Sequence, residues 1–102
     1  MLSLFADFAA GVFLCNCIPH LAAGLRGEPF PSPFATPHGV GNSRPVVNVL
    51  WGLSNAVAGV SLLAYAPVKV GFNLPSLSVL VGALAVGIYV AIHFGRVRRA
   101  NR

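Results

Sequence analysis

Three long stretches of apolar residues divide this chain, and each is long enough to cross a lipid bilayer. They run from about 4 to 25, 46 to 66 and 74 to 94, and the second and third contain no charged residue. A helix of 21 residues is about 31 Å long, which matches a hydrocarbon core of about 30 Å. The pattern predicts an all-α integral membrane protein, with three transmembrane helices packed in a compact bundle that forms one domain over residues 1–102.

Composition agrees with this prediction and excludes several classes of protein. Hydrophobic residues make up 56% of the chain and charged residues only 9%, whereas soluble domains carry about 25% charged residues. The values exclude a disordered chain and a soluble nucleic-acid-binding protein. The first stretch has no basic residue before it and contains Asp7, so we expect a retained span rather than a cleaved signal peptide.

The connection between the first two spans is long and irregular. Residues 26–45 hold five prolines and three glycines, which is incompatible with a regular helix. Two antiparallel neighbours need only a few connecting residues, so this Pro/Gly-rich loop is expected to form a lid or a docking surface. Phe30, Phe34 and Arg44 are its candidate docking residues.

Basic residues are distributed unevenly about the three spans. Six of the seven lie in the loop or in the tail 95–102, and only Lys69 lies on the other side. The positive-inside rule therefore predicts that the loop and the C-terminus are cytoplasmic and that the N-terminus is outside. The net charge of +5 favours contact with anionic lipid over nucleic acid. The candidate lipid-contacting residues are Arg96, Arg98, Arg99 and Arg102.

Small and polar residues recur at helical spacing in every span, which predicts that these faces pack together. The stripe of the second span consists of Asn48, Gly52, Asn55, Ala56 and Gly59. The stripe of the third consists of Ser78, Gly82, Ala85, Tyr89 and His93, and that of the first of Asn16, His20, Ala23 and Gly24. Pro19 is expected to bend the first span.

Polar side chains inside a membrane are costly and often functional. The sequence predicts that several converge on one pocket near the cytoplasmic side. These candidates are Asn16, His20, His38, Asn48, Asn55 and His93. Other interpretations remain open: a hydrogen bond from His20 to Asn48 or to a carbonyl freed by Pro19, and a surface position for His38 and His93. Asp7 is expected near the outer interface, where an acid suits the helix dipole.

No complete catalytic or metal-binding set is recognisable. The chain has one Asp and one Glu, and Cys15 and Cys17 lie about 200° apart on a helix. We expect no enzyme activity, no metal and no cofactor, with a haem between His20 and His93 as the exception considered. The predicted function is that of an accessory or assembly subunit, which acts through helix packing and its cytoplasmic-side loop. The predicted partners are the lipid bilayer and either a homo-oligomer or a larger membrane complex. The alternative is an oligomeric small transporter or channel, or a haem-binding protein.

Overall fold

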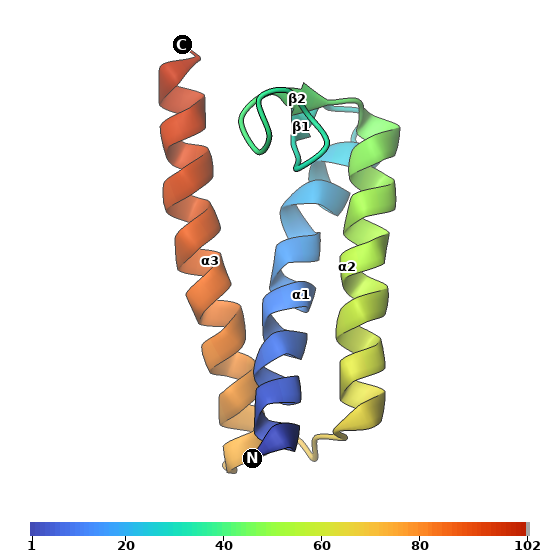
Figure 1. The fold of residues 1–102 in the computed structure, drawn as a ribbon, viewed down its shortest axis with the longest axis vertical. Helices are drawn as coiled ribbons and strands as arrows, with labels where there is room; N and C mark the ends of the chain where they lie inside the picture. The colour runs from blue at the N-terminus through green and yellow to red at the C-terminus, as the bar shows by residue number, and fades with distance from the viewer. Residues whose placement is uncertain (102) are drawn as a thin grey trace.

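The computed structural model describes residues 1–101, which form three long helices and one short two-stranded sheet (Figure 1). Helix α1 spans Leu2–Leu25, α2 spans Pro45–Tyr65 and α3 spans Leu74–Ala100. Strands β1 (Phe30–Pro31) and β2 (Asn42–Ser43) lie in the loop between α1 and α2. All three helices are long and apolar enough to cross a membrane. The predicted all-α architecture with three spans is therefore confirmed.

Local chemistry marks the helix ends close to where the sequence predicts them. Pro45 opens α2 at its first position, where the missing N–H of proline costs nothing. Asn73 caps α3 by accepting a hydrogen bond from the backbone N–H of Ser76 at 2.9 Å. Helix α3 differs from the prediction, because it continues through the basic tail to Ala100. Arginines in a last helical turn interact favourably with the helix dipole.

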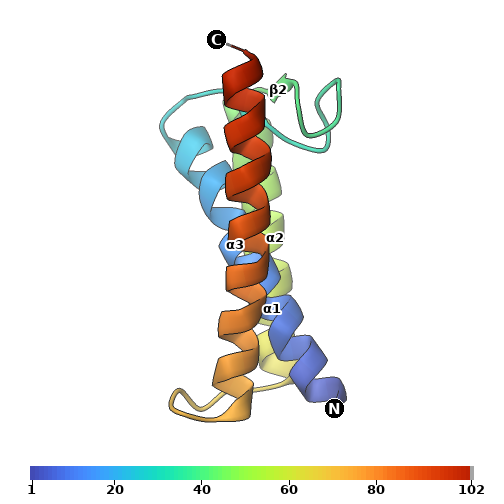
Figure 2. The ribbon, with the colours of Figure 1, turned by 90° about the vertical axis from the view of Figure 1, so that its left-hand side faces the viewer.

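Helix α1 lies between the other two (Figure 1). It packs along both α2 and α3, whereas α2 and α3 hardly contact each other. Helices α1 and α3 run in the same direction and α2 runs against them (Figures 1 and 2). We call the end with Met1 and the connection 66–73 the turn end. The opposite end, which carries the loop 26–44, is the loop end.

The closest approach of α1 to α3 is in the half of the bundle nearest the turn end. A Cβ atom added to Gly11 would lie 2.0 Å from the carbonyl oxygen of Val79, and one added to Gly82 would lie 2.0 Å from that of Phe8. Only glycine allows the two backbones to come this close. Towards the loop end α3 leans away from α1 (Figure 1).

The small-residue stripes predicted for α2 and α3 differ in how far they are buried. In α2 the predicted face is buried, with Asn48, Gly52, Asn55 and Gly59 all inaccessible. In α3 only Gly82 of the predicted stripe is buried, while Ala85 and Tyr89 are exposed. The expectation that these two residues face the bundle is therefore wrong, because at their level α3 turns a different face, with Val86 and Gly87, towards α1.

The loop 26–44 folds over the loop end of the bundle (Figures 1 and 2). Strands β1 and β2 pair antiparallel, with Phe30 opposite Ser43 and Pro31 opposite Asn42. Beneath the loop α1 changes direction (Figure 1), in the half of the helix that contains Pro19. Bend and loop together bring the end of α1, the strands and the start of α2 into one cluster.

Candidate functional site

A buried His–Asn pair lies at the centre of the loop end. His20 of α1 and Asn48 of α2 are 2% and 0% exposed, and His20 Nδ1 is 2.9 Å from Asn48 Oδ1. The amide nitrogen of Asn48 faces three carbonyl oxygens, so Oδ1 is the acceptor atom of this side chain. The histidine therefore carries its hydrogen on Nδ1 and donates it to Asn48.

Asn48 ties this pair to the loop. Its Nδ2 donates to the carbonyl oxygens of Phe30 at 2.9 Å, Ser43 at 3.3 Å and Arg44 at 3.4 Å. The position is favourable because Asn48 lies in the first turn of α2, directly below both strands. One side chain thus connects α1, α2 and both strands.

The surroundings of the His20 imidazole are aromatic. Phe30, Trp51 and Phe94 meet it edge-on, with ring centroids 5.5, 6.3 and 6.1 Å away. Phe30, expected to dock a partner, is thus half-buried inside the cluster. Phe34 is 64% exposed and packs edge-on against Trp51. The second expected docking aromatic therefore does lie on the outer surface of the loop.

Further hydrogen bonds hold the loop to itself and to α3. The hydroxyls of Ser32 and Ser43 are 2.6 Å apart and buried. His93 of α3 donates from Nε2 to the carbonyl oxygen of Gly39 at 2.7 Å. His38 is exposed and donates from Nδ1 to the carbonyl oxygen of Pro33 at 2.7 Å. Hydrogen bonds therefore join the loop to each of the three helices, and others join parts of the loop to one another.

The remaining predicted pair lies deeper in the membrane. Asn16 donates from Nδ2 to Asn55 Oδ1 at 3.0 Å, and Asn55 Nδ2 donates to the carbonyl oxygen of Trp51 at 2.8 Å. The six predicted polar residues therefore do not form one pocket. They form separate contacts: His20 with Asn48, Asn16 with Asn55, and each of His38 and His93 with a loop carbonyl.

The geometry does not fit a haem between His20 and His93. Phe94 packs against both imidazole rings, with ring centroids 6.1 and 5.1 Å away. Each histidine also has one ring nitrogen in a hydrogen bond to the protein. A haem bridging the two would have to displace Phe94. No cluster of three metal-binding side chains occurs among residues 1–101.

The basic residues of the tail extend α3 beyond the loop. Arg96, Arg98 and Arg99 are exposed, as is Arg44 at the start of α2, while Arg102 lies outside the described residues. The exposed pair of Arg26 and Glu28 lies at the end of α1, where the guanidinium hydrogen bond lowers the pKa of the Glu28 carboxyl. The exposure of the arginines at one end of the bundle suits contact with lipid headgroups.

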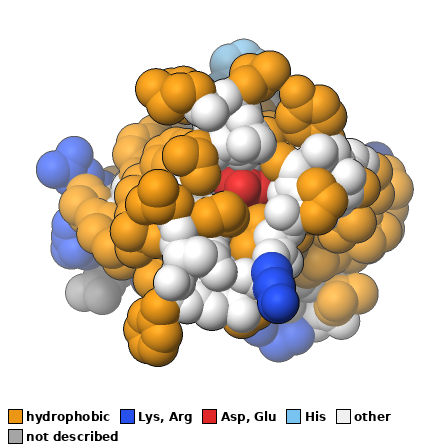
Figure 3. Space-filling model, turned by 90° about the horizontal axis from the view of Figure 1, so that it is seen from below, with side chains coloured by type: hydrophobic (Ala, Val, Ile, Leu, Met, Phe, Trp, Pro, Cys, Tyr) orange, Lys and Arg blue, Asp and Glu red, His pale blue; other side chains and the backbone are white. Residues whose placement is uncertain are grey.

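The turn end holds a buried polar residue of a different kind. Asp7 is 1% exposed, and its Oδ1 atom has no hydrogen-bond partner within residues 1–101. Figure 3 shows acidic atoms at the centre of this end, surrounded by hydrophobic and uncharged groups. Sequence reasoning placed Asp7 at the interface and missed its burial. The available signal was the small residues Ala10 and Gly11, which continue its face of α1 one turn later.

One other buried polar atom lacks a partner in the described chain. The indole Nε1 of Trp51 makes no hydrogen bond. Trp51 itself lines a hollow of about 380 Å³ beside Phe34, together with Val47, Leu50 and Ser54. A neutral N–H costs much less to leave unpaired than a carboxylate does. Of the two exceptions to the rule that buried polar groups are hydrogen-bonded, Asp7 is therefore the more informative.

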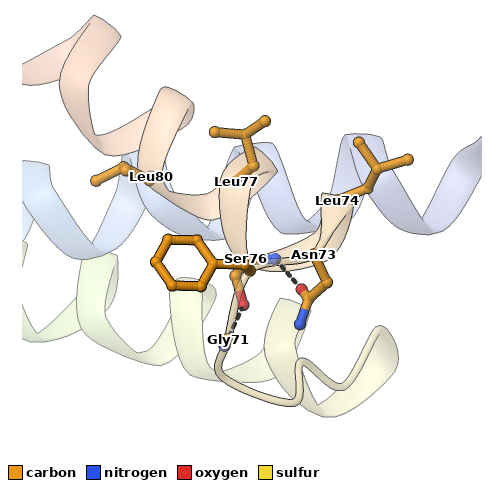
Figure 4. Close-up of a pocket in the computed structure, with 7 residues that line it drawn as sticks. Gly71, Asn73, Leu74, Ser76, Leu77 and Leu80 are labelled. Atoms are coloured by element: carbon orange, nitrogen blue, oxygen red, sulfur yellow. Dashed lines mark hydrogen bonds between the residues drawn. The ribbon is translucent and has the colours of Figure 1, made fainter.

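A surface hollow lies at the start of α3 (Figure 4). It has a volume of about 570 Å³, and Phe72, Leu74, Leu77 and Leu80 form its apolar wall. The polar groups in it cap the helix, since Ser76 accepts from Gly71 N and donates its own N–H to Asn73. The hollow therefore offers apolar surface with its polar groups already engaged, as expected of a surface that faces lipid.

No protein-family model, curated protein or solved structure matches this chain.

Proposed function

We propose that this protein is a non-enzymatic accessory or assembly subunit of a membrane complex. It acts by packing its helices within the bilayer and by presenting the loop 26–44 to a partner. The single observation that carries this proposal is the bonding of the loop to the helices through Asn48. A loop that is held in one conformation is a preformed surface, and preformed surfaces lose less conformational entropy on binding.

The outer side of this loop offers groups suited to recognition. Phe34 is largely exposed, and His38 and Arg44, which follow it in the loop, are also exposed. Aromatic and arginine side chains dominate the binding energy of many interfaces. This surface, which we call the loop face, is the proposed docking site.

The bonding of the histidines supports a binding role over a catalytic one. A general base needs a ring nitrogen within reach of substrate. Here His20 is enclosed by aromatic rings, and His38 and His93 donate to loop carbonyls. These residues hold the loop face in place.

We also propose that the loop end faces the cytoplasm. The loop and the tail carry six of the seven basic residues, and Lys69 alone is at the turn end. Single cysteines at Thr36 and Lys69, both exposed, test the orientation after Cys15 and Cys17 are replaced by alanine. In intact cells an impermeant maleimide should label the Lys69 position only. Labelling of the Thr36 position would reverse the topology.

Native mass spectrometry of the protein extracted from its own membrane tests the accessory role. A second polypeptide at fixed stoichiometry is expected, and Phe34→Ala should remove it without lowering thermal stability. Leu84→Ala, an exposed apolar position on α3 far from the loop, is the matched control. A homo-oligomer without a second polypeptide would overturn the proposal and favour the transporter or channel alternative.

A further inference from the structure

The unpaired carboxylate of Asp7 is level with an apolar groove between α2 and α3. The groove has a volume of about 560 Å³, within the range of small-molecule sites. Its lining residues are Leu63, Pro67, Val68, Val70, Ser76, Val79, Leu80 and Ala83.

Contacts between the helices fix the depth of Asp7 relative to this groove. The Ser78 hydroxyl donates to the carbonyl of Leu4 at 2.6 Å, and the backbone of Gly11 lies against Val79 and Ala83. Asp7 lies halfway between Leu4 and Gly11, so it is level with Val79 and its neighbours on α3. Two residues that line the groove, Val79 and Ala83, therefore also contact α1.

The packing of the helices allows access from the groove to this carboxylate. Both α2 and α3 are held by α1 and hardly contact each other. A ligand in the groove therefore has few direct α2–α3 contacts to break before it reaches the face of α1. Asp7 is one helical turn before Ala10, which lies against Gly59 of α2, and Gly11, which lies against α3, so its side chain faces the gap between α2 and α3.

The chemistry of the two features together defines a ligand class. A carboxylate inside a membrane is expensive and is normally paired with a positive group, yet Asp7 Oδ1 has no partner in residues 1–101. The groove beside it is almost entirely apolar. The complementary ligand has one positive charge and a large apolar surface.

We propose that the turn end is a binding site for lipophilic organic cations, in which Asp7 neutralises the charge and the α2–α3 groove holds the apolar groups. Inorganic cations fit this site less well, because apart from the Ser76 hydroxyl the groove supplies no side-chain oxygen. The site is at the opposite end from the loop face and does not depend on the proposed function.

Binding of tetraphenylphosphonium to the purified full chain in detergent tests the proposal. Isothermal titration should show saturable binding to the wild type. It should weaken at least about tenfold in Asp7→Asn, because the positive charge loses its buried partner. Asp7→Glu, which keeps the charge, should retain most of the affinity. Tetraphenylborate has the same shape and the opposite charge, and it should not bind.

A second pair of variants tests the groove itself. Leu80→Trp fills the groove and should weaken binding, whereas Leu84→Trp, one turn further along α3 and equally exposed, should not. Equal binding of both probes, equal affinity in Asp7→Asn, or no saturable binding to a folded wild type would each overturn the proposal. Because loss of the loop face leaves this site intact, failure here is distinct from failure of the accessory role.

Discussion

The loop end and the turn end bury polar side chains to the same degree but treat them in opposite ways. His20 and Asn48 at the loop end are as inaccessible as Asp7 at the turn end. The first two are bonded to each other and to the loop, while Asp7 Oδ1 has no partner in the described chain. Burial alone therefore does not distinguish a polar group that the protein pairs from one that it leaves unpaired.

The largest effect on stability is expected from disrupting the hydrogen bonds of the loop end. Asn48→Ala removes the acceptor of the His20 N–H and the donor to three loop carbonyls. Leaving these groups unpaired should lower the free energy of unfolding by about 3 kcal/mol or more. Denaturant unfolding in detergent measures it, and faster proteolysis of the loop should accompany it.

Ser54→Ala is the matched control for this variant. Its hydroxyl donates only to the Leu50 carbonyl of its own helix and is exposed, so stability should be unchanged. If both variants behaved alike, Asn48 would not be what holds the loop.

A packing variant tests whether the turn end depends on backbone contact instead of polar bonds. Gly82→Ala places a Cβ 2.0 Å from the Phe8 carbonyl oxygen, so α1 and α3 must separate. We expect a loss of about 2 kcal/mol, as for other overpacked interiors. Gly87→Ala on the same helix meets only Cys15 Sγ at 3.5 Å and should be tolerated. Equal losses in the two would show that α1 and α3 do not meet at Gly82.

Replacing Asp7 by a neutral residue should change the free energy of unfolding in the opposite direction from replacing Asn48. Asp7→Asn replaces a buried carboxyl group whose Oδ1 has no partner in residues 1–101, and it should raise the free energy of unfolding by about 1 kcal/mol in buffer without organic cations. Thermal unfolding in detergent checks this. A loss of stability would mean that the carboxylate supports the fold, and the contrast between the two ends would disappear.

Most of the fold could be predicted because it depends on simple periodic signals. Length and apolarity define the three spans, Pro45 and Asn73 mark helix starts, and the Asn48–Gly59 face of α2 follows from 3.6-residue spacing. The face of α3 could not be predicted in this way. Ala85 and Tyr89 continue the spacing of Gly82, but at this level α3 contacts α1 through Gly87, which lies against Cys15, and leaves them exposed.

The site was only partly predictable for a similar reason. Depth along each span correctly brought His20 next to Asn48, since both lie near the same end of antiparallel helices. Depth could not show that the carbonyls of the loop would satisfy Asn48, because no sequence pattern fixes the path of a proline-rich loop. Nor could it show the burial of Asp7, which depends on how closely two glycines let α1 and α3 approach.

The smallest effect is expected midway between the two ends, where Asn16 bonds to Asn55 at 3.0 Å. Interhelical hydrogen bonds in membranes contribute about 0.6 kcal/mol on average, because the separated helices find other partners. A double-mutant cycle with Asn16→Leu and Asn55→Leu, measured by denaturant unfolding in detergent, should therefore give a coupling energy of about that size. A coupling of several kcal/mol would place this pair with the Asn48 network and extend the polar framework of the loop end deeper into the membrane. No coupling would leave α1 and α2 joined here by the close contacts of Gly52 and Gly59 alone. The loop end would then be a cap on an otherwise apolar interface.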